Sequence, residues 1–336
     1  MYTRPPELAD DTIVASLAEH WHIDPVELSY EPVGFGAHHW KATDTEGIEL
    51  FLTVHDLTAH RNHDTESEDG VFRRLTASFT AARALHDGGL TAVLAPTPTA
   101  DGRIVDRMDS QFTLAVHPFL HGRPAGAFGG FTAPVDRREA LDLVVDVHRH
   151  TELAAPHADE DDLVVPHTGE IPVALDELGT AWDAGPYAGS ARGHLAAHAP
   201  GVQRLLVRYE QLAEEVRQRD GRVLTHGEPH AANVLVVGDR RLLIDWDTAL
   251  VAVPERDLWH LDPGDGSILE AYRDATGVTP SPAAVDLYRL WWDLTEIGGY
   301  LGVLRRPHTD TTDVAMAWKG LQEYCDPAAR WPGLVG

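Results

Sequence analysis

Lysine and cysteine are the residues that this sequence has least of. Lys41 and Lys319 are the only lysines among 336 residues, and Cys325 is the only cysteine. A single cysteine excludes an intramolecular disulfide, and residues 1–11 lack the apolar run of a signal peptide, so we expect a cytoplasmic protein. No stretch approaches the roughly 18 uninterrupted apolar residues that a membrane span requires, so no membrane partner is expected.

Acidic side chains greatly outnumber basic ones. The chain has 27 Lys and Arg against 53 Asp and Glu, which gives a net charge of −26. A nucleic-acid partner is disfavoured because phosphate contacts need patches of Lys and Arg. A cationic small molecule is favoured because an acidic cleft concentrates cations. A halophilic or simply solubilising surface would have the same composition, and the sequence leaves the oligomeric state open.

The densest chemistry lies between Val223 and Asp247. Two apolar, β-prone runs, 234–237 and 242–244, flank Gly238-Asp239, which is a two-residue hairpin signal. Polar groups stand just outside this hairpin: His226, Glu228, His230 and Asn233 before it, and Asp245 and Asp247 after it.

A carboxylate, an amide five residues later and a second carboxylate across a hairpin suit magnesium-dependent phosphoryl transfer. We expect Glu228 to position the acceptor hydroxyl, and Asn233 and Asp245 to offer hard oxygen ligands to the metal. These three residues are the predicted catalytic set. Protein kinases have the same order of groups along the chain.

Two alternatives compete for the same residues. His226, Glu228 and His230 have the residue types of a zinc site. An H-E-x-x-H site needs a helix, however, and Pro229 stands where such a helix would need an N–H group. A structural hairpin with solvated acids is the other alternative; it is disfavoured because acids bordering apolar strands are costly unless paired or metal-bound.

The residues 226–233, HGEPHAAN, resemble the loop H-G-D-x-H-x-x-N of the aminoglycoside phosphotransferase family, and the residues 244–247, IDWD, resemble its metal segment. Within that family the sequence is most similar to the spectinomycin-phosphotransferase-like branch. The resemblance extends from Pro32 to about His308. The family usually has Asp at the position of Glu228, which is the one departure within the motif.

The resemblance implies an α+β, bilobal, protein-kinase-like fold. Residues 1–117 would form a nucleotide-binding N-lobe, with an antiparallel sheet and a helix. Residues 118–336 would form a larger, mainly helical C-lobe with the catalytic loop, the metal site and the acceptor pocket. The implied cofactors are ATP, with GTP as an alternative, and Mg²⁺. Structural roles fall to His226, His230, Asp247 and Asp257, the last as a brace for the catalytic loop through backbone N–H groups.

Residue patterns fit this N-lobe. Gly34-Phe35-Gly36 follows a predicted strand, so its backbone amides can approach phosphates; the same pattern also occurs in ordinary tight turns. Apolar spacing predicts a helix over 66–86 that ends at Gly88-Gly89. Strands are expected over 28–33, 38–43, 48–54, 91–93 and 112–117, followed by a hinge over 118–122.

The third strand lacks the Lys that normally holds the ATP phosphates. Thr53 stands in its place. Lys41 and His39 lie two residues apart on the second strand and therefore share one face of the sheet, so either could supply a substitute cation. An exposed Lys41 without a role is an equally valid reading. The family resemblance further places Val116 and Phe119 in the segment whose backbone pairs with adenine.

Three features of the C-lobe bear on the acceptor. Asp293 and Glu296 share one face of a predicted helix over 287–301, and the resemblance implies that this helix lines the acceptor pocket, so both are expected to contact substrate ammonium groups. The acidic stretch 157–170 reads as a solvated loop or as a lid over a cationic substrate. His148 and His150 read as ordinary polar positions of a helix over 136–150.

Two functional classes remain. The first is an ATP-dependent O-phosphotransferase acting on a cationic aminocyclitol or aminoglycoside-like small molecule, either as an antibiotic resistance enzyme or as a biosynthetic kinase. The second is a pseudokinase that binds nucleotide or ligand without turnover, an alternative raised by Glu228 and Thr53. We favour the enzyme because the metal ligands are present and Glu keeps the carboxylate that the chemistry needs.

Overall fold

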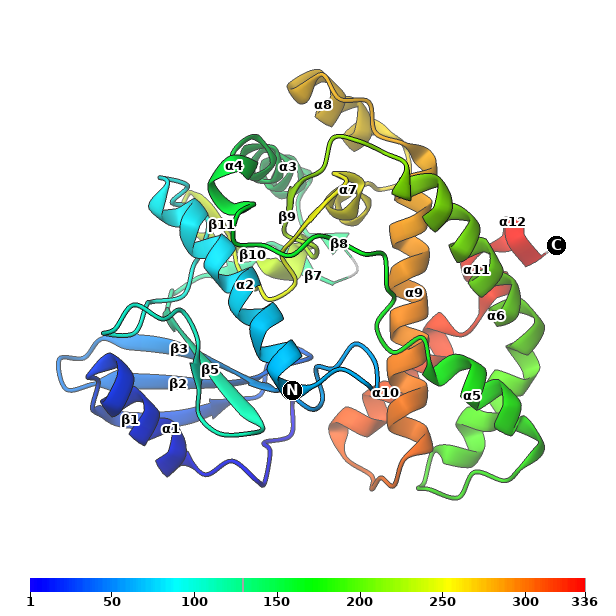
Figure 1. Ribbon diagram of the computed structural model, residues 1–336, viewed down its shortest axis with the longest axis horizontal. Coiled ribbons are helices and arrows are strands. Elements are labelled where there is room, and N and C mark those ends of the chain that lie inside the picture. Colours follow the sequence, from blue (N-terminus) through cyan, green and yellow to red (C-terminus); the bar gives the residue numbers. More distant parts are fainter. Residues whose placement is uncertain (129, 336) are drawn as a thin grey trace.

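A five-stranded antiparallel sheet forms the N-lobe of the computed structural model, which describes residues 1–128 and 130–335 (Figure 1). The order of strands across the sheet is β1-β2-β3-β5-β4. The predicted strands over 28–33, 38–43, 48–54 and 112–117 are all present, with ends displaced by a few residues. The strands are β1 (Pro25–Glu31), β2 (His38–Asp44), β3 (Glu49–Asp56), β4 (Asp106–Arg107) and β5 (Phe112–Pro118).

The two faces of this sheet differ in chemistry because side chains alternate along each strand. The outer face is apolar: Trp40 and Leu52 are fully buried against Ile13 and Leu17 of α1 (Asp10–Ser16) and the following turn η1 (Leu17–Trp21). The opposite face, called the underside below, looks toward the C-lobe. It carries His39, Lys41, Thr53, His55 and His117.

Helix α2 (Glu68–Asp87) packs on the underside of the sheet (Figure 1). The Ser67 side chain caps its first turn by accepting a hydrogen bond from the N–H of Gly70, and the helix ends at Gly88 as the sequence predicts. Phe79 of α2 contacts the rings of His55 and His117, with centroids 5.7 and 6.0 Å apart. The α2 helix therefore closes one end of the underside.

The predicted hairpin is the central element of the C-lobe. Strand β10 (Val234–Val237) pairs with β11 (Arg240–Leu243) around Gly238, whose φ of 59° favours glycine. The predicted strand over 91–93 is wrong as an independent element. Its Val93 instead forms a parallel bridge with Leu243, so this segment extends the hairpin of the C-lobe.

Helices make up most of the C-lobe. The long helices α6 (Ala188–Arg217) and α9 (Pro282–Arg305) pack together over a shared apolar core that includes Leu205 and Leu294. The remaining helices are α3 (Pro134–Arg149), α4 (Thr151–Ala154), α5 (Glu170–Asp176), η2 (Glu177–Gly179), η3 (Ala231–Asn233), α7 (Glu255–Leu261), α8 (Ser267–Thr276), α10 (Thr312–Tyr324), α11 (Pro327–Arg330) and α12 (Pro332–Val335). Short strands complete the lobe: β6 (Arg123–Pro124), β7 (Gly126–Ala127), β8 (Gly130–Phe131), β9 (Val223–Thr225) and β12 (Leu250–Ala252).

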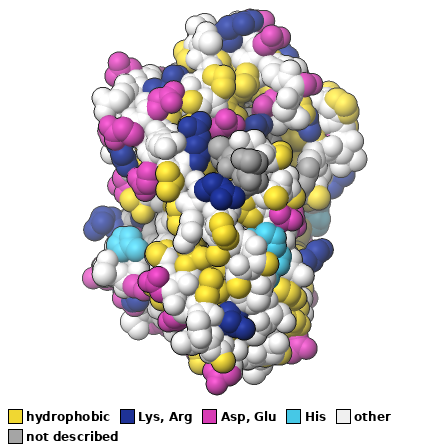
Figure 2. All heavy atoms as spheres, turned by 90° about the vertical axis from the view of Figure 1, so that its right-hand side faces the viewer, with side chains coloured by type: hydrophobic (Ala, Val, Ile, Leu, Met, Phe, Trp, Pro, Cys, Tyr) yellow, Lys and Arg dark blue, Asp and Glu magenta, His cyan; other side chains and the backbone are white. Residues whose placement is uncertain are grey.

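Figure 2 shows how charged side chains are distributed on one face of the molecule. On the face shown in Figure 2, acidic side chains are interspersed with basic and apolar ones. Among the described residues, no helix is long and apolar enough to cross a membrane. The predicted α+β bilobal fold is confirmed in its two parts, an antiparallel N-terminal sheet and a helical C-terminal region.

Candidate active site

The hairpin brings Asn233 and Asp245 to the same end of the C-lobe sheet. The carbonyl oxygen of Asn233 accepts a hydrogen bond from the N–H of Ile244 at 3.0 Å. Asp245 follows Ile244 directly, with a φ of 68°. This left-handed conformation is uncommon outside glycine, and such strain clusters at functional sites.

Asn233 is oriented as a metal ligand needs to be. Its amide nitrogen donates to the carbonyl oxygen of Glu228 at 3.1 Å. This bond fixes the side chain and leaves the amide oxygen without a hydrogen-bond partner among the described residues. A free amide oxygen is a ligand type that Mg²⁺ accepts.

Asp245 lies among other carboxylates. Removal from bulk water, then repulsion from Asp247 and from Glu228, raises its pKa well above the usual range. Its side chain is still reachable by solvent from the cleft. A crowded, accessible group of carboxylates is stabilised by a bound cation, so the residues present fit the Mg²⁺ ion that a kinase-like site requires.

Glu228 lies at the tip of the catalytic loop, residues 226–233. Its backbone N–H donates to Nδ1 of His226 at 3.2 Å, and its side chain approaches Nε2 of His230 at 3.6 Å. The carboxylate is partly exposed to the cleft. Nε2 of His226 in turn contacts the carbonyl oxygen of Ile244 at 2.8 Å. Because both ring nitrogens of His226 are used, the zinc alternative fails.

Asp257 braces the catalytic loop from below. Its carboxylate accepts the backbone N–H groups of His226 at 2.9 Å and Gly227 at 2.6 Å. These are the contacts that the resemblance implies. Burial raises the pKa of Asp257, but the hydrogen bond and charge of His148, together with His226 and the N–H of Gly227, lower it by more, so the net pKa shift is downward.

His148 was misjudged from the sequence. It is not an ordinary polar position of a helix: it is buried, with Nε2 3.1 Å from Asp257 and Nδ1 3.0 Å from the hydroxyl of Tyr272. The one available signal was its place among valines in LDLVVDVHRH, on the apolar stripe of its helix. The side chain of His150, by contrast, contacts only the carbonyl oxygen of Asp146 among the hydrogen-bonding groups of the described residues.

Gly227 and Arg256 were not singled out from the sequence either. Gly227 has a φ of 99°, and a Cβ there would lie 2.6 Å from Nη1 of Arg256. The buried Arg256 donates to the hydroxyl of Thr225 and to the carbonyl oxygen of Thr248, both at 2.8 Å. Only glycine fits between the loop and this guanidinium group.

The glycine loop, Gly34 to Gly36, covers the underside of the N-lobe sheet. Both glycines have positive φ, 71° and 84°. A Cβ at Gly34 would lie 3.4 Å from Nε2 of His39, and His39 pairs with Thr53 across β2 and β3. The structure thus brings His39 beside the position where Lys is missing. Burial lowers the pKa of His39 to about 3, so the ring is neutral and does not replace the cation.

Lys41 does not lie as the substitute-cation hypothesis requires. Its ammonium group pairs with Glu49 and lies 4.4 Å from the ring centroid of Phe119. Phe119 belongs to the hinge, and its N–H bonds the carbonyl oxygen of Glu49. Lys41 is therefore directed toward the hinge end of the cleft rather than toward the glycine loop.

His55 was also missed by the sequence reading, although it lies two residues beyond Thr53 on the same face. Its Nε2 is 3.2 Å from Oδ2 of Asp247, and its side chain is fully buried. This contact links the N-lobe directly to the metal segment. Burial and the neighbouring His55 lower the pKa of His60 to about 3, which leaves His60 neutral.

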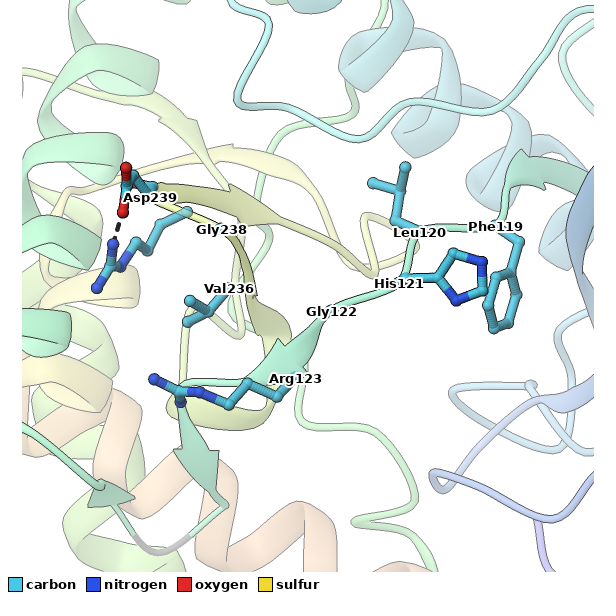
Figure 3. Close-up of a pocket in the computed structure, with 9 residues that line it drawn as sticks. Phe119, Leu120, His121, Gly122, Arg123, Val236, Gly238 and Asp239 are labelled. Carbon is cyan, nitrogen blue, oxygen red and sulfur yellow. Dashed lines mark hydrogen bonds between the residues drawn. The ribbon is translucent and has the colours of Figure 1, made fainter.

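The hinge uses some of the backbone groups expected to bind adenine. The Val116 carbonyl accepts the N–H of Thr97 at 2.6 Å, and the Phe119 N–H is donated to Glu49. Neither of these two groups is free, so this part of the hinge expectation needs correction. An open hollow of about 590 Å³ lies beside the hinge, with Arg123 and Arg241 among its lining residues (Figure 3). None of Glu228, Asn233 or Asp245 lines it, so we do not assign it to the nucleotide phosphates or to the acceptor.

Helix α9 places Trp292 and Glu296 close to the catalytic loop. Desolvation, followed by repulsion from Glu228, raises the pKa of Glu296 to about 7, against a hydrogen bond from Tyr300. Trp292 stacks on Phe128 with 5.1 Å between ring centroids, and Phe128 contacts His230 of the catalytic loop at 4.8 Å. An acid and an aromatic platform therefore flank Glu228.

Asp293 is not a substrate contact. It is buried and accepts hydrogen bonds from Arg330 at 2.6 and 2.7 Å and from the indole N–H of Trp331 at 2.7 Å. The pairing consumes both carboxylate oxygens. Asp293 is three residues from Glu296, but it faces α11 rather than the cleft.

The acidic stretch 157–170 is not a lid. The N–H of Asp161 bonds the carbonyl oxygen of Val251 in β12 at 2.9 Å, and the carboxylate of Asp161 accepts the Tyr288 hydroxyl at 2.7 Å. Buried Leu163 and Val165 then fix the chain to the C-lobe core. These anchors hold the segment in place.

Comparison with known proteins agrees with this geometry. The model of the phosphotransferase enzyme family (APH) matches residues 29–291. Protein StrN of Streptomyces griseus is 30% identical over 265 residues, which cover 74% of this chain and 76% of that protein.

Solved structures share the fold. The chain is similar to spectinomycin phosphotransferase in complex with ADP and spectinomycin, with a TM-score of 0.73 and 17% identity over 97% of this chain and 99% of that one. It is also similar to a thermostable mutant of an aminoglycoside phosphotransferase in complex with AMP-PNP and hygromycin B. The TM-score is 0.52, and the identity is 14% over 95% of this chain and 99% of that one. The pseudokinase alternative finds no support in these relatives, which are small-molecule phosphotransferases.

Proposed function

Because the chain belongs to the phosphotransferase enzyme family, and is therefore a small-molecule kinase, we propose that it transfers the terminal phosphoryl group of ATP to a hydroxyl of a cationic aminocyclitol or aminoglycoside-like compound. The observation that carries this proposal is the convergence of Glu228, Asn233 and Asp245 at one end of the hairpin.

Asn233 and Asp245 would hold Mg²⁺, which supplies charge neutralisation at the nucleotide phosphates. The backbone of the glycine loop would cover those phosphates from above. Adenine would lie at the hinge, with the Val116 carbonyl and the Phe119 N–H already occupied, so residues 118–121 offer the remaining backbone groups. The ADP and AMP-PNP bound by structurally similar enzymes favour an adenine nucleotide over GTP.

Glu228 would orient the acceptor hydroxyl and accept its proton. In a loose, metaphosphate-like transition state the proton leaves late, so positioning is the main demand on this carboxylate. Glu reaches one methylene further than Asp. An acceptor seated against Trp292 and Phe128 would be set back from the loop, and the longer side chain compensates for that distance.

Glu296 supports the assignment of a cationic acceptor. A carboxyl group with a pKa near 7 is stabilised as a carboxylate when an ammonium group binds beside it. The aromatic faces of Trp292 and Phe128 would add cation–π and apolar contacts.

The proposal is tested by measuring ADP release from ATP with a panel of hydroxylated amines. A neutral glycoside of similar size is the matched control. We expect acceptor-dependent ADP release only with cationic members, and weaker acceptor binding as salt rises, because the screening length falls to about 8 Å at physiological ionic strength. A preferred neutral or anionic acceptor would contradict the substrate class.

A further inference from the structure

Three ligand-type side chains meet beneath the glycine loop and lie outside the set assigned to Mg²⁺. They are His55 at the end of β3, His60 in the loop that follows, and Asp247 in the metal segment. One ring nitrogen or carboxylate oxygen from each lies within 4.8 Å of the others. The rings of His55 and His60 meet edge to face, with centroids 4.8 Å apart.

His60 is prepared as a ligand by its own hydrogen bond. Nδ1 contacts the carbonyl oxygen of Asp56 at 3.0 Å. This contact requires a proton on Nδ1 and leaves the lone pair on Nε2, the arrangement found in metal-bound histidines. Nε2 lies under the glycine loop, since a Cβ at Gly36 would be 3.8 Å from it. It has no hydrogen-bond partner among the described residues.

The spacing of the other two groups suits a zinc-type ion. Bonds of about 2.0–2.2 Å in tetrahedral geometry separate neighbouring ligand atoms by about 3.3 Å. Nε2 of His55 and Oδ2 of Asp247 are 3.2 Å apart. Three protein ligands leave a fourth position open, as in catalytic zinc sites.

We propose that His55, His60 and Asp247 bind one divalent transition-metal ion of the zinc type, whose open coordination position faces the phosphates of the nucleotide. The second clause rests on the proposed function; the binding of the ion does not.

The charge of such a site accounts for the missing Lys. Two neutral imidazoles and one carboxylate around a divalent ion leave one net positive charge, which is the charge that a Lys at position 53 would supply. Thr53 brings no charge, and burial keeps His39 neutral. Lys41 is paired with Glu49 toward the hinge.

Ligand chemistry separates this site from the Mg²⁺ site. Asn233 and Asp245 offer oxygen only, which suits Mg²⁺. Two imidazoles favour zinc or cobalt over magnesium. The two sites are nevertheless adjacent, because Asp245 and Asp247 are separated by Trp246 alone.

The test uses full-length, chelator-treated protein without nucleotide. Co²⁺ is titrated and followed by its visible absorption, and Zn²⁺ affinity is measured by competition with a chromogenic chelator. We expect one equivalent of either ion to bind. His60→Gln and His55→Gln should each weaken binding by about 100-fold or more, since losing even a hydrogen-bond partner of a ligand costs about 10–100-fold. The exposed His63→Gln is the matched control and should bind as wild type does.

Asp245→Asn distinguishes the two sites. It removes a proposed Mg²⁺ ligand only, so this variant should retain Co²⁺ binding. Absence of binding to wild type at micromolar ion would overturn the proposal, and so would unchanged binding in His60→Gln or loss confined to Asp245→Asn. His55 is fully buried; if its variant does not fold, the less buried His60 decides the matter. If the ion does not bind and the protein still phosphorylates an acceptor with ATP and Mg²⁺, this site is rejected while the proposed function stands.

Discussion

The two sides of the cleft, called the N-lobe wall and the C-lobe wall below, differ in the charge of their side chains. On the N-lobe wall, which comprises the underside of the sheet and the loop after β3, burial lowers the pKa of His39 and His60 to about 3 and that of His117 to about 4, so this wall presents neutral imidazoles. The C-lobe wall presents the carboxylates Glu228 and Asp245; desolvation, followed by repulsion from neighbouring carboxylates, raises the pKa of Asp245. Neither set of side chains neutralises a triphosphate. In this account bound cations, rather than a fixed Lys, do so.

The largest loss of turnover is expected for substitution of Asp245, the proposed Mg²⁺ ligand on the C-lobe wall. Asp245→Asn keeps the shape of the side chain but removes a charged oxygen ligand. Since a metal ion supplies several kcal/mol to the transition state, turnover should fall by roughly a thousandfold. Steady-state rates and calorimetric binding of ATP with Mg²⁺ are the measurements. If the variant has the wild-type rate and the wild-type affinity for ATP with Mg²⁺, Asp245 is not a metal ligand.

Glu228 is expected to give the next largest loss. Glu228→Gln removes the basic oxygen at constant shape, and losing a general base costs about 100-fold or more in kcat. Glu228→Asp tests geometry separately: shortening the side chain should also slow turnover, because near-attack geometry tolerates little displacement.

Wild-type activity in Glu228→Gln would show that Glu228 is not the acid–base group. Activity that appears only in Glu228→Asp, with every acceptor inactive in wild type, would return the protein to the pseudokinase class.

A smaller effect is expected at Glu296, on the acceptor side. Glu296→Gln should raise KM for a cationic acceptor about tenfold, equivalent to about 1.4 kcal/mol, with little change in kcat. In the wild type, acceptor affinity should fall as pH drops below about 7, because the carboxyl group then binds a proton in the free enzyme. The Gln variant should lose this pH dependence.

Stability supplies a control for the same variant. The folded state raises the pKa of Glu296 from 4.5 to about 7 and so binds more protons than the unfolded chain between these values. Stability from this group therefore falls as pH rises through that window. Glu296→Gln should melt higher than wild type at pH 8 and similarly at pH 4. A lower melting temperature at pH 8 would contradict the pKa shift.

The smallest effect is expected at Lys41. Since its ammonium group pairs with Glu49 and lies over Phe119, Lys41→Met should change KM for ATP less than threefold, roughly the value of an exposed ion pair. If KM for ATP rises tenfold or more, Lys41 contacts the phosphates. The N-lobe wall would then carry a cation of its own, unlike the neutral wall described above.

Local structure could be predicted from the sequence better than the long-range contacts of individual side chains. The hairpin around Gly238 and the end of α2 at Gly88 follow from short-range turn and capping chemistry, and both were predictable. The roles of His148 and Asp293 were not, because the groups that bond them, Asp257 and Arg330, lie 109 and 37 residues away along the chain.

The N-lobe shows the same limit. Alternation places His39, Thr53 and His55 on one face, so the sharing of a face could be read from spacing. That Lys41 pairs with Glu49 depends on the register of β2 against β3, and that His55 reaches Asp247 depends on how the two lobes meet. Residue spacing within one strand carries no information on that contact.

Phosphorus NMR of the complete reaction detects the proposed phosphoryl transfer itself. The protein is incubated with ATP, Mg²⁺ and a cationic aminocyclitol or aminoglycoside that stimulates ADP release, with Asp245→Asn as the inactive control. We expect ADP together with a new phosphomonoester resonance that is coupled to a proton of the acceptor and is absent in the control. ADP accompanied only by inorganic phosphate, or no consumption of ATP with any cationic acceptor, would contradict the proposed function.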